Sequence, residues 1–329
     1  MFKAAGGAVL ATMPNSNFKL TAKRTFIVGL DGSSLSMRSV MVASMHADQY
    51  NDNLIIVTLG KSDSDRTTIF DRFASQAKDI AMRCGHPFVR IATEYVEVPK
   101  DMSLADTLIE LVDRGTQPVG GTVLVMGAAG KGDEGRNQGR KPAGQPPMGS
   151  LAFACLEQCK QPVILVKSGP APPTGGERIK RAGLDGTKGL NLMVTVEKDA
   201  SAHVSRKAFD MALGFGTKGL ERKFDTVFLY HVKNGGDDSA FYEEYKEELE
   251  KLNEGGMYKE TSCVIEPKKH EIRQHIEEVV EAKNVDLLVM GSVELSEAGG
   301  RHLGSVTTAV AKSTSANVCV VKNYAYTWC

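Results

Sequence analysis

The stretch TVLVMG at residues 122–127, followed by Gly-Ser at residues 149–150, decides the fold because the chain contains it twice. The second copy reads DLLVMG at residues 286–291 and is followed by Gly-Ser at residues 304–305. Each copy has an apolar run typical of a buried strand, a Gly-containing loop, and a Gly-Ser pair that can begin a helix. We therefore expect two similar units, each with a loop and helix start of the size that holds a phosphate.

The repeat extends beyond these stretches. FIVGLD at residues 26–31 corresponds to LMVTVE at residues 192–197, and QPVILVK at residues 161–167 corresponds to ANVCVVK at residues 316–322. The loop between strand and Gly-Ser pair is nine residues longer in the first copy. The duplication therefore covers two whole domains, one of which carries an insertion.

A chain of 329 residues accommodates two compact domains of about 150 residues each. Residues 168–189 are rich in Gly and Pro and lack apolar periodicity, which is typical of a linker. We predict a disordered tail at residues 1–24, a first domain at 25–167, the linker at 168–189, a second domain at 190–323 and a tail at 324–329.

Short apolar runs alternate with segments of helical periodicity in both halves. Runs that read as continuous Val, Ile and Leu indicate parallel strands that are buried on both faces and covered by helices. With right-handed crossovers, we predict an α/β fold of two doubly wound, five-stranded, parallel-sheet domains. The expected strands lie at residues 26–30, 54–59, 89–98, 122–126, 162–167, 191–196, 226–232, 259–265, 287–290 and 318–322.

Composition excludes two classes of partner. The 40 basic and 40 acidic side chains cancel, so there is no electrostatic footprint for nucleic acid. No apolar run of 18 or more residues occurs, so no membrane helix is predicted.

Six cysteines without a Cys-x-x-Cys pair indicate a reducing, cytoplasmic location. Cys155 and Cys159 share a helical face, where packing is favoured over a redox pair.

The first 24 residues contain no Asp or Glu. This composition fits a disordered tail or an organelle transit peptide, and we favour the tail because the apolar part is short and interrupted by Gly.

Asp31 and Ser33 follow the first predicted strand, at the carboxyl edge where doubly wound sheets bind ligands. The Asp31 carboxylate can accept hydrogen bonds from an adenine amino group or from ribose hydroxyls, and Gly32 permits a tight turn. Both side chains are also typical helix caps. From these residues alone, capping is the better interpretation.

The loop after the fourth strand carries the second candidate element. Gly127 and Gly130 let backbone N–H groups face an anion, and Gly149 and Ser150 begin a helix whose positive dipole end favours phosphate. The intervening segment, residues 130–147, contains Lys131, Arg136, Arg140 and Lys141. We interpret it either as a mobile functional loop that clamps phosphate or as a solvated tip.

These residues resemble the nucleotide motif of the universal stress protein (UspA) family, which has Asp-x-Ser after strand one and Gly-x2-Gly-x9-Gly-[Ser/Thr] after strand four. The first copy has every letter, as Asp31-Gly32-Ser33 and Gly127-x2-Gly130-x18-Gly149-Ser150, with the spacer doubled. The resemblance covers residues 26–322 apart from the linker. It implies an adenine nucleotide alpha hydrolase-like fold, a role in stress adaptation and the binding of ATP, with or without Mg²⁺.

The resemblance also implies where the ligand lies. Adenine is expected near Leu54 and Asp31. The phosphates are expected among Gly127, Gly130, Gly149 and Ser150, and Ser33 is a further binding residue of the motif.

The second copy departs from the family's pattern. Glu197 stands at the Asp position and Glu294 at the second Gly, while Gly291, Gly304 and Ser305 are retained. A carboxylate near a polyanion in a water-excluded site is strongly unfavourable. We therefore expect this second site to be degenerate and to bind ATP weakly or not at all.

No nucleophile and base arrangement stands out in the sequence, so no catalytic residue is assigned and at most slow ATP hydrolysis is expected. The seven histidines are scattered, and we expect His231, His270 and His275 to be packed or solvated. His302 is the one that neighbours a Gly-Ser pair. No two-His or Cys-His metal spacing occurs, so no metal site is predicted.

Two functions remain open at this point. One is a module that binds and senses ATP through the first domain. The other is a ligand-free assembly protein in which both sites are vestigial. In the family that the chain resembles, the fifth strands of two subunits pair, so residues 162–167 and 317–322 are expected to pair within this chain as an internal pseudo-dimer. Whether two such chains form a homodimer stays open.

Overall fold

The computed structural model describes residues 24–47, 52–84, 89–114, 121–129, 148–167, 189–197, 202–215, 225–233, 239–256, 258–268, 270–292, 295–297 and 300–322. Across these ranges, no helix combines the length and the apolar character needed to cross a bilayer. The predictions for residues 1–23, 130–147, 168–188 and 323–329 lie outside the described part of the chain.

The N-terminal domain has the strands that its sequence predicts, in the same order. The strands are β1 (Thr25–Gly29), β2 (Asn53–Gly60), β3 (Arg90–Glu97), β4 (Thr122–Gly127) and β5 (Val163–Val166). The helices are α1 (Ser34–His46), α2 (Asp63–Asp65), α3 (Asp71–Cys84), α4 (Leu104–Arg114) and α6 (Ser150–Gln158). A short π-helix, η1 (Arg66–Phe70), joins α2 to α3.

The C-terminal domain repeats this order. Its long strands are β6 (Asn191–Thr195), β7 (Thr226–Lys233), β8 (Glu260–Pro267), β9 (Leu287–Ser292) and β12 (Asn317–Lys322). Its helices are α8 (Ala202–Phe215), α9 (Ser239–Glu254), α10 (Ile272–Ala282) and α11 (Ser305–Ser313). A small hairpin, β10 (Leu295–Glu297) and β11 (Gly300–His302), lies between β9 and α11 where the sequence predicts a loop.

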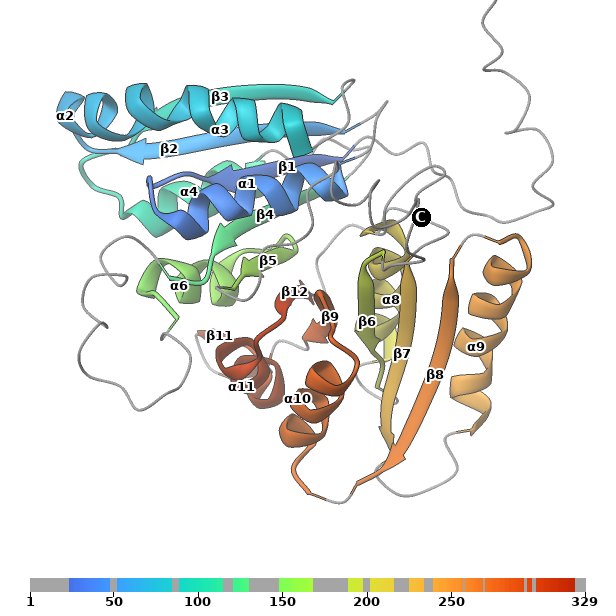
Figure 1. Cartoon of the computed structure of the whole chain (residues 1–329). Helices are drawn as coiled ribbons and strands as arrows, with labels where there is room; N and C mark the ends of the chain where they lie inside the picture. Colours follow the sequence, from blue (N-terminus) through green and yellow to red (C-terminus); the bar gives the residue numbers. More distant parts are fainter. Residues whose placement is uncertain are drawn as a thin grey trace, which may run out of the picture.

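The ten long strands form one sheet in the order β3-β2-β1-β4-β5-β12-β9-β6-β7-β8 (Figure 1). Pairing within each domain is parallel. At the centre, β5 and β12 pair antiparallel, with Val163 opposite Val320. The predicted fold of two doubly wound, five-stranded α/β domains is confirmed.

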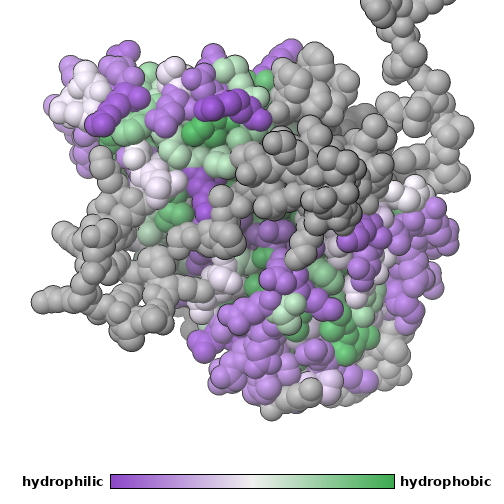
Figure 2. Space-filling model, in the orientation of Figure 1, coloured by the Kyte–Doolittle hydropathy of each residue, from purple (hydrophilic) through white to green (hydrophobic). Residues whose placement is uncertain are grey.

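Helices cover both faces of the sheet. One core cluster contains residues of α1, α3, α8 and α9, and the other contains residues of α4, α6, α10 and α11, so each cluster spans both domains. The central strands β4, β5 and β12 are buried almost throughout, whereas the edge strands β3 and β8 are largely half-buried or exposed. Figure 2 shows hydrophilic residues over the outward surfaces of α9 and α10.

Two buried lysines cross the junction between the domains in opposite directions. Lys322, at the end of β12, donates from Nζ to the carbonyl oxygens of Glu157 (2.8 Å) and Cys159 (2.6 Å), at the end of α6. Lys167, just after β5, donates to the carbonyl oxygen of Ala311 in the last turn of α11. Each domain therefore supplies a cation to the end of a helix in the other, where the helix dipole favours positive charge.

On the opposite face of the sheet, Arg24 and His46 of the N-terminal domain contact the end of α8. Arg24 pairs with Asp52 and donates to the Gly214 carbonyl oxygen (2.9 Å), while His46 Nδ1 lies 2.5 Å from the Phe215 carbonyl oxygen. Arg24 is therefore part of the fold, which corrects its assignment to the tail. The ion pair and the helix-end carbonyl hold this charged side chain in a buried position.

Cys155 and Cys159 pack in the core beneath α6. Burial raises the pKa of the Cys155 thiol to about 12 and also raises the pKa of Cys159 above its usual value. Because thiol exchange requires the thiolate, both residues are poor redox groups, and the packing interpretation is the one that fits.

Burial lowers the pKa of Lys167 to about 8 from an ordinary value of 10.5. Between these values the unfolded chain binds more protons than the folded protein, so this residue should make the free energy of unfolding rise as pH increases through that range. We expect Lys167→Met to remove this contribution, on the order of 1–3 kcal/mol, from the pH dependence measured by chemical denaturation. The exposed Lys160→Met is the control. Identical pH profiles for wild type and Lys167→Met would refute the assignment.

Candidate functional site

The strand order places a ligand site between β1 and β4. β1 pairs with β2 on one side and with β4 on the other, so the chain switches direction across the sheet at this point. In doubly wound sheets, ligands bind outside the carboxyl ends of the strands at such a switch point. β6 has the same position in the C-terminal domain, between β7 and β9.

The turn after β1 fixes Asp31 and Ser33. Asp31 Oδ1 accepts a hydrogen bond from the Ser33 backbone N–H (2.9 Å), and Ser33 Oγ accepts one from the Ser36 N–H (3.0 Å), so Ser33 is the N-cap of α1. Gly32 has a φ of 77°, where a side chain is strained, and a Cβ there would lie 2.8 Å from the Phe73 ring. The capping interpretation of this turn is confirmed, and both Asp31 and Ser33 also line the cavity described below.

The first glycine of each strand-four motif is required by helix packing. A Cβ on Gly127 would lie 2.8 Å from Leu35 Cβ in the first turn of α1. A Cβ on Gly291 would lie 2.8 Å from Val204 Cγ1 and 3.1 Å from the Val204 backbone in α8. Both positions therefore need Gly for the fold, whether or not a ligand binds.

The two Gly-Ser pairs begin helices without a side-chain cap. Gly149 is the N-cap of α6, and its own N–H donates to the Ala128 carbonyl oxygen (2.8 Å). Gly304 is the N-cap of α11, and its N–H donates to Ser292 Oγ (3.2 Å). Neither cap residue offers a side-chain acceptor to the first turn of its helix, and the N–H groups of a first turn have no intrahelical partner, so they suit water or a ligand.

A cavity of about 360 Å³ lies at the switch point of the N-terminal domain. Apolar residues from β2, η1, α4 and β4 form most of its wall, and the turn after β1 and the start of α6 form its polar side. Asp31 is the charged residue among the described residues that line it. The lining residues that carry the argument are Gly29, Asp31, Val57, Leu104, Leu108 and Ser150.

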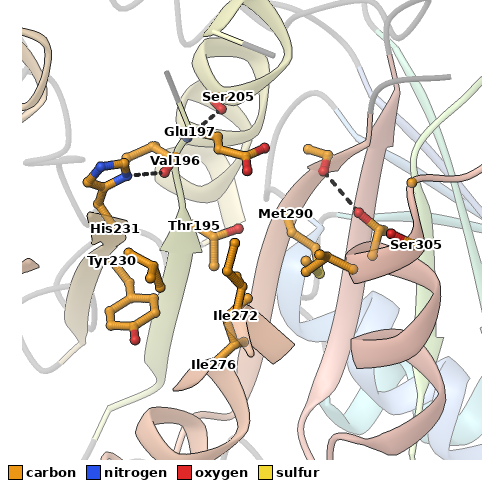
Figure 3. A pocket seen from close by; sticks show the side chains of 15 residues that line it. Thr195, Val196, Glu197, Ser205, Tyr230, His231, Ile272, Ile276, Met290 and Ser305 are labelled. Carbon is orange, nitrogen blue, oxygen red and sulfur yellow. Dashed lines mark hydrogen bonds between the residues drawn. The ribbon is translucent and has the colours of Figure 1, made fainter. Parts of the chain in front are cut away.

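The C-terminal domain has a cavity of about 240 Å³ in the equivalent position. Figure 3 shows Glu197 and Ser205 on one side of it, with Ser305 across from them. The Glu197 backbone N–H donates to Ser205 Oγ (2.8 Å), and His231 Nδ1 lies 2.9 Å from the Val196 carbonyl oxygen. The exposed carboxylate of Glu197 therefore stands at the position that Asp31 has in the first domain.

The two cavities differ in side-chain size at one register position. Gly29 at the end of β1 pairs with Val57, and the equivalent residue of β6, Thr195, pairs with Tyr230. All four residues line the cavities, and a Cβ on Gly29 would meet nothing within 4 Å. The C-terminal domain therefore has a larger side chain at both positions of this pair.

Comparisons with known proteins agree with this duplicated architecture. Residues 191–322 match the sequence model described as the universal stress protein family. The C-terminal domain belongs to the universal stress protein family. None of the curated proteins matches the chain.

Solved structures extend the likeness to both domains. A universal stress protein from Archaeoglobus fulgidus DSM 4304 is 14% identical, with a TM-score of 0.57 over 91% of this chain and 98% of its own. A protein of unknown function from Pseudomonas aeruginosa PAO1 is 12% identical, with a TM-score of 0.55 over 92% of this chain and 93% of its own. At such identities the comparison shows the fold alone. The whole chain thus has the fold of a tandem universal stress protein.

The structure brings most of the predicted universal stress protein motif together. Asp31, Ser33, Gly127, Gly149 and Ser150 all line the N-terminal cavity. In the second domain, the residues that line the cavity are Glu197, Gly291, Gly304 and Ser305. Gly130 and Glu294 lie outside the described residues.

Leu54 is placed away from the cavity. It is fully buried in the core and pairs with Phe26 near the start of β1, whereas the cavity lies at the other end of these parallel strands. The residues of β2 that line the cavity are Val57 and Leu59. The resemblance implied Leu54, which lies near the start of β2, although the carboxyl end of a strand is the end that faces a ligand.

Sequence reasoning also missed two parts of the wall. Gly29 interrupts the apolar run of β1, and a Gly inside a strand often marks a close approach of backbone or ligand, so this signal was available. Leu104 and Leu108 of α4 are separated by four residues, which places them on one helix face. Their counterparts Ile272 and Ile276 line the second cavity.

The packing role of Gly127 predicts a loss of stability on substitution. We expect Gly127→Ala to lower the free energy of unfolding by about 1–3 kcal/mol, because the new Cβ collides with Leu35. Gly29→Ala is the matched control, since it adds the same methyl group in open space within the same sheet. Urea denaturation measures both variants, and equal stabilities would contradict the packing argument.

Proposed function

We propose that the N-terminal domain binds an adenine nucleotide, ATP, in its cavity and that the protein senses nucleotide through this site. The observation that carries the proposal is the start of α6, which opens into the cavity without a side-chain cap. The C-terminal universal stress protein domain makes a nucleotide ligand the natural first candidate.

Backbone amides of α6 are the groups proposed to bind phosphate. Ser150, Leu151 and Ala152 form the first turn of α6, and all three line the cavity. The N–H groups of a first turn have no intrahelical partner, and the helix dipole adds attraction for an anion. Ser150 is exposed and adds a hydroxyl donor. A Mg²⁺ ion would be held mainly by the phosphates and water.

The rest of the cavity suits the nucleoside. Val57, Leu59 and Met126 present apolar surface for the flat base, and Asp31 provides a carboxylate that can accept hydrogen bonds from ribose hydroxyls or the adenine amino group. A volume of about 360 Å³ is within the range of small-molecule sites, about 300–1,000 Å³. Size and chemistry therefore both accommodate an adenine nucleotide.

We propose that the C-terminal cavity binds ATP weakly or not at all. Its volume of about 240 Å³ is below that range. Thr195 and Tyr230 occupy space that Gly29 and Val57 leave open, and Glu197 adds negative charge beside a ligand that is itself an anion. The two domains are thus proposed to have different roles.

The role of the α6 start can be tested by adding a negative charge there. We expect Ser150→Asp to weaken ATP binding to the full chain by about tenfold or more, about 1.4 kcal/mol, measured by isothermal titration calorimetry. An acidic residue in the first turn interacts favourably with the positive end of the helix dipole, so the thermal midpoint of unfolding should stay the same or rise. This combination separates loss of ligand from loss of fold.

Ser305→Asp is the matched control, because it makes the same change at the start of α11. It should leave ATP affinity nearly unchanged. If Ser305→Asp weakens binding as much as Ser150→Asp does, the assignment to the N-terminal domain is wrong.

The open space beside Gly29 in the N-terminal cavity gives a second, independent test of the nucleotide site. Gly29→Thr introduces into the first domain the residue that the second domain has at this position. We expect it to weaken ATP binding by about tenfold, since the side chain enters the cavity, while the free energy of unfolding changes by less than about 1 kcal/mol. Gly29→Ala should have a smaller effect on affinity. Unchanged affinity in Gly29→Thr would place the ligand elsewhere.

A second candidate function is assembly without a ligand. It is favoured by the buried β5 and β12 contact and its reciprocal lysines, which would serve as the internal counterpart of a subunit interface. Absence of ATP binding to the wild-type chain, even at millimolar nucleotide, would favour this function over the first.

A further inference from the structure

A cluster of two imidazoles and a carboxylate lies beside the C-terminal cavity, outside the proposed nucleotide site. His270 precedes α10, while His275 and Glu278 lie on that helix. One potential ligand atom from each of the three residues lies within 4.8 Å of those of the other two. We propose that His270, His275 and Glu278 bind a divalent first-row metal ion, for which Zn²⁺ is the best match.

The local chain geometry brings the three side chains together. His275 and Glu278 are three residues apart on a helix, so they share a face. The His270 ring stacks on the His275 ring, with centroids 4.1 Å apart and planes 7° apart, and His270 Nε2 lies 3.3 Å from Glu278 Oε2. All three ligands therefore come from one segment of nine residues.

The surroundings of His275 favour metal coordination through Nε2. His275 is buried, and its Nδ1 lies 3.5 Å from Glu266 Oε2 on β8. Glu266 Oε2 in turn lies 3.4 Å from the Tyr230 hydroxyl, which donates to it. A carboxylate on the second nitrogen of a ligand histidine fixes the tautomer and makes the metal-binding nitrogen more basic. The Nε2 lone pair is already directed to the cluster, since it accepts the His270 backbone N–H (3.3 Å).

The other two ligands can adjust to an ion. Tetrahedral zinc places N and O ligands about 3.3 Å apart, so the cluster must contract by about 1 Å or more. The side chains of His270 and Glu278 are 37% and 67% exposed, which leaves room for rotation. His270 would exchange its stacking contact for coordination, while His275 would give up the His270 N–H contact.

Ligand type selects the metal. Two imidazoles and one carboxylate suit Zn²⁺ and similar ions, whereas Ca²⁺ and Mg²⁺ prefer oxygen ligands. Three protein ligands leave the fourth position of a tetrahedral ion for water. Of the nearby cations, Arg273 lies against Glu277 at 3.5 Å, and Lys268 lines a surface groove together with His270. The carboxylates of Glu266 and Glu278 offset the charge of the lysine and of the ion.

The site would connect metal binding to the C-terminal cavity. Ile272 and Ile276 lie on the helix that carries two of the ligands, and Figure 3 shows both isoleucines and Tyr230 at the cavity. The N-cap of α10, Glu271, makes no side-chain cap hydrogen bond. A metal ion that joins His270 to His275 would therefore stabilise the start of α10, the helix that forms one wall of that cavity.

The experiment titrates Zn²⁺ into the full, tag-free chain after chelator treatment, in competition with a chromophoric zinc chelator. We expect one zinc ion per chain with micromolar or tighter affinity, together with a rise in the thermal midpoint. His270→Ala and Glu278→Gln should each weaken binding by about tenfold or more. Both side chains are partly or largely exposed, so the variants should keep the metal-free thermal midpoint of the wild type. His275 is left unchanged because it is buried.

His203→Ala is the control, since it removes an exposed histidine on α8. It should bind zinc as the wild type does. Substitution with Co²⁺ should give tetrahedral absorption without a thiolate charge-transfer band, which separates this site from cysteine sites. Absence of stoichiometric binding, a thiolate band, or unchanged affinity in both His270→Ala and Glu278→Gln would each overturn the proposal.

Discussion

The antiparallel contact between β5 and β12 is the constraint on which both domains depend. Both strands are almost completely buried, β5 as Val, Ile and Leu and β12 mainly as Val and Cys, and without each other each would be an unprotected apolar edge. Their pairing joins two five-stranded sheets into one and lets both hydrophobic cores continue from one domain into the other. Lys167 and Lys322 then fix the helices that flank the contact.

The strands could be predicted from the sequence because buried parallel strands read as continuous apolar runs, and the internal repeat supplied the topology. The crossed lysines could not be predicted, because a Lys at the end of an apolar run normally reaches solvent, and the helix-end carbonyls that accept its hydrogen bonds come from the other domain. The cluster around His275 was missed for a similar reason. Its spacing spans a loop and a helix, and Glu266, which lies beside His275, comes from a neighbouring strand.

The motif residues have more than one role. Gly127 and Gly291 are needed for close packing of a helix on a strand, and Ser33 caps α1. These three residues therefore have a structural role, whether or not a ligand binds. What distinguishes the two domains lies instead at the paired strand ends, where Gly29 and Val57 correspond to Thr195 and Tyr230. The two cavities thus differ in side-chain volume at this register position, in addition to the exchange of Asp31 for Glu197.

The joining of two domains in one chain changes which substitutions the contact between β5 and β12 can accept. In a symmetric dimer of identical domains, a substitution in the contacting strand appears on both sides at once and must fit its own copy. Here Val163 faces Val320, so either residue can change while the other stays. Covalent fusion thereby frees the two halves to diverge, and the different residues of the Gly29–Val57 and Thr195–Tyr230 pairs show that they differ beside the cavities as well.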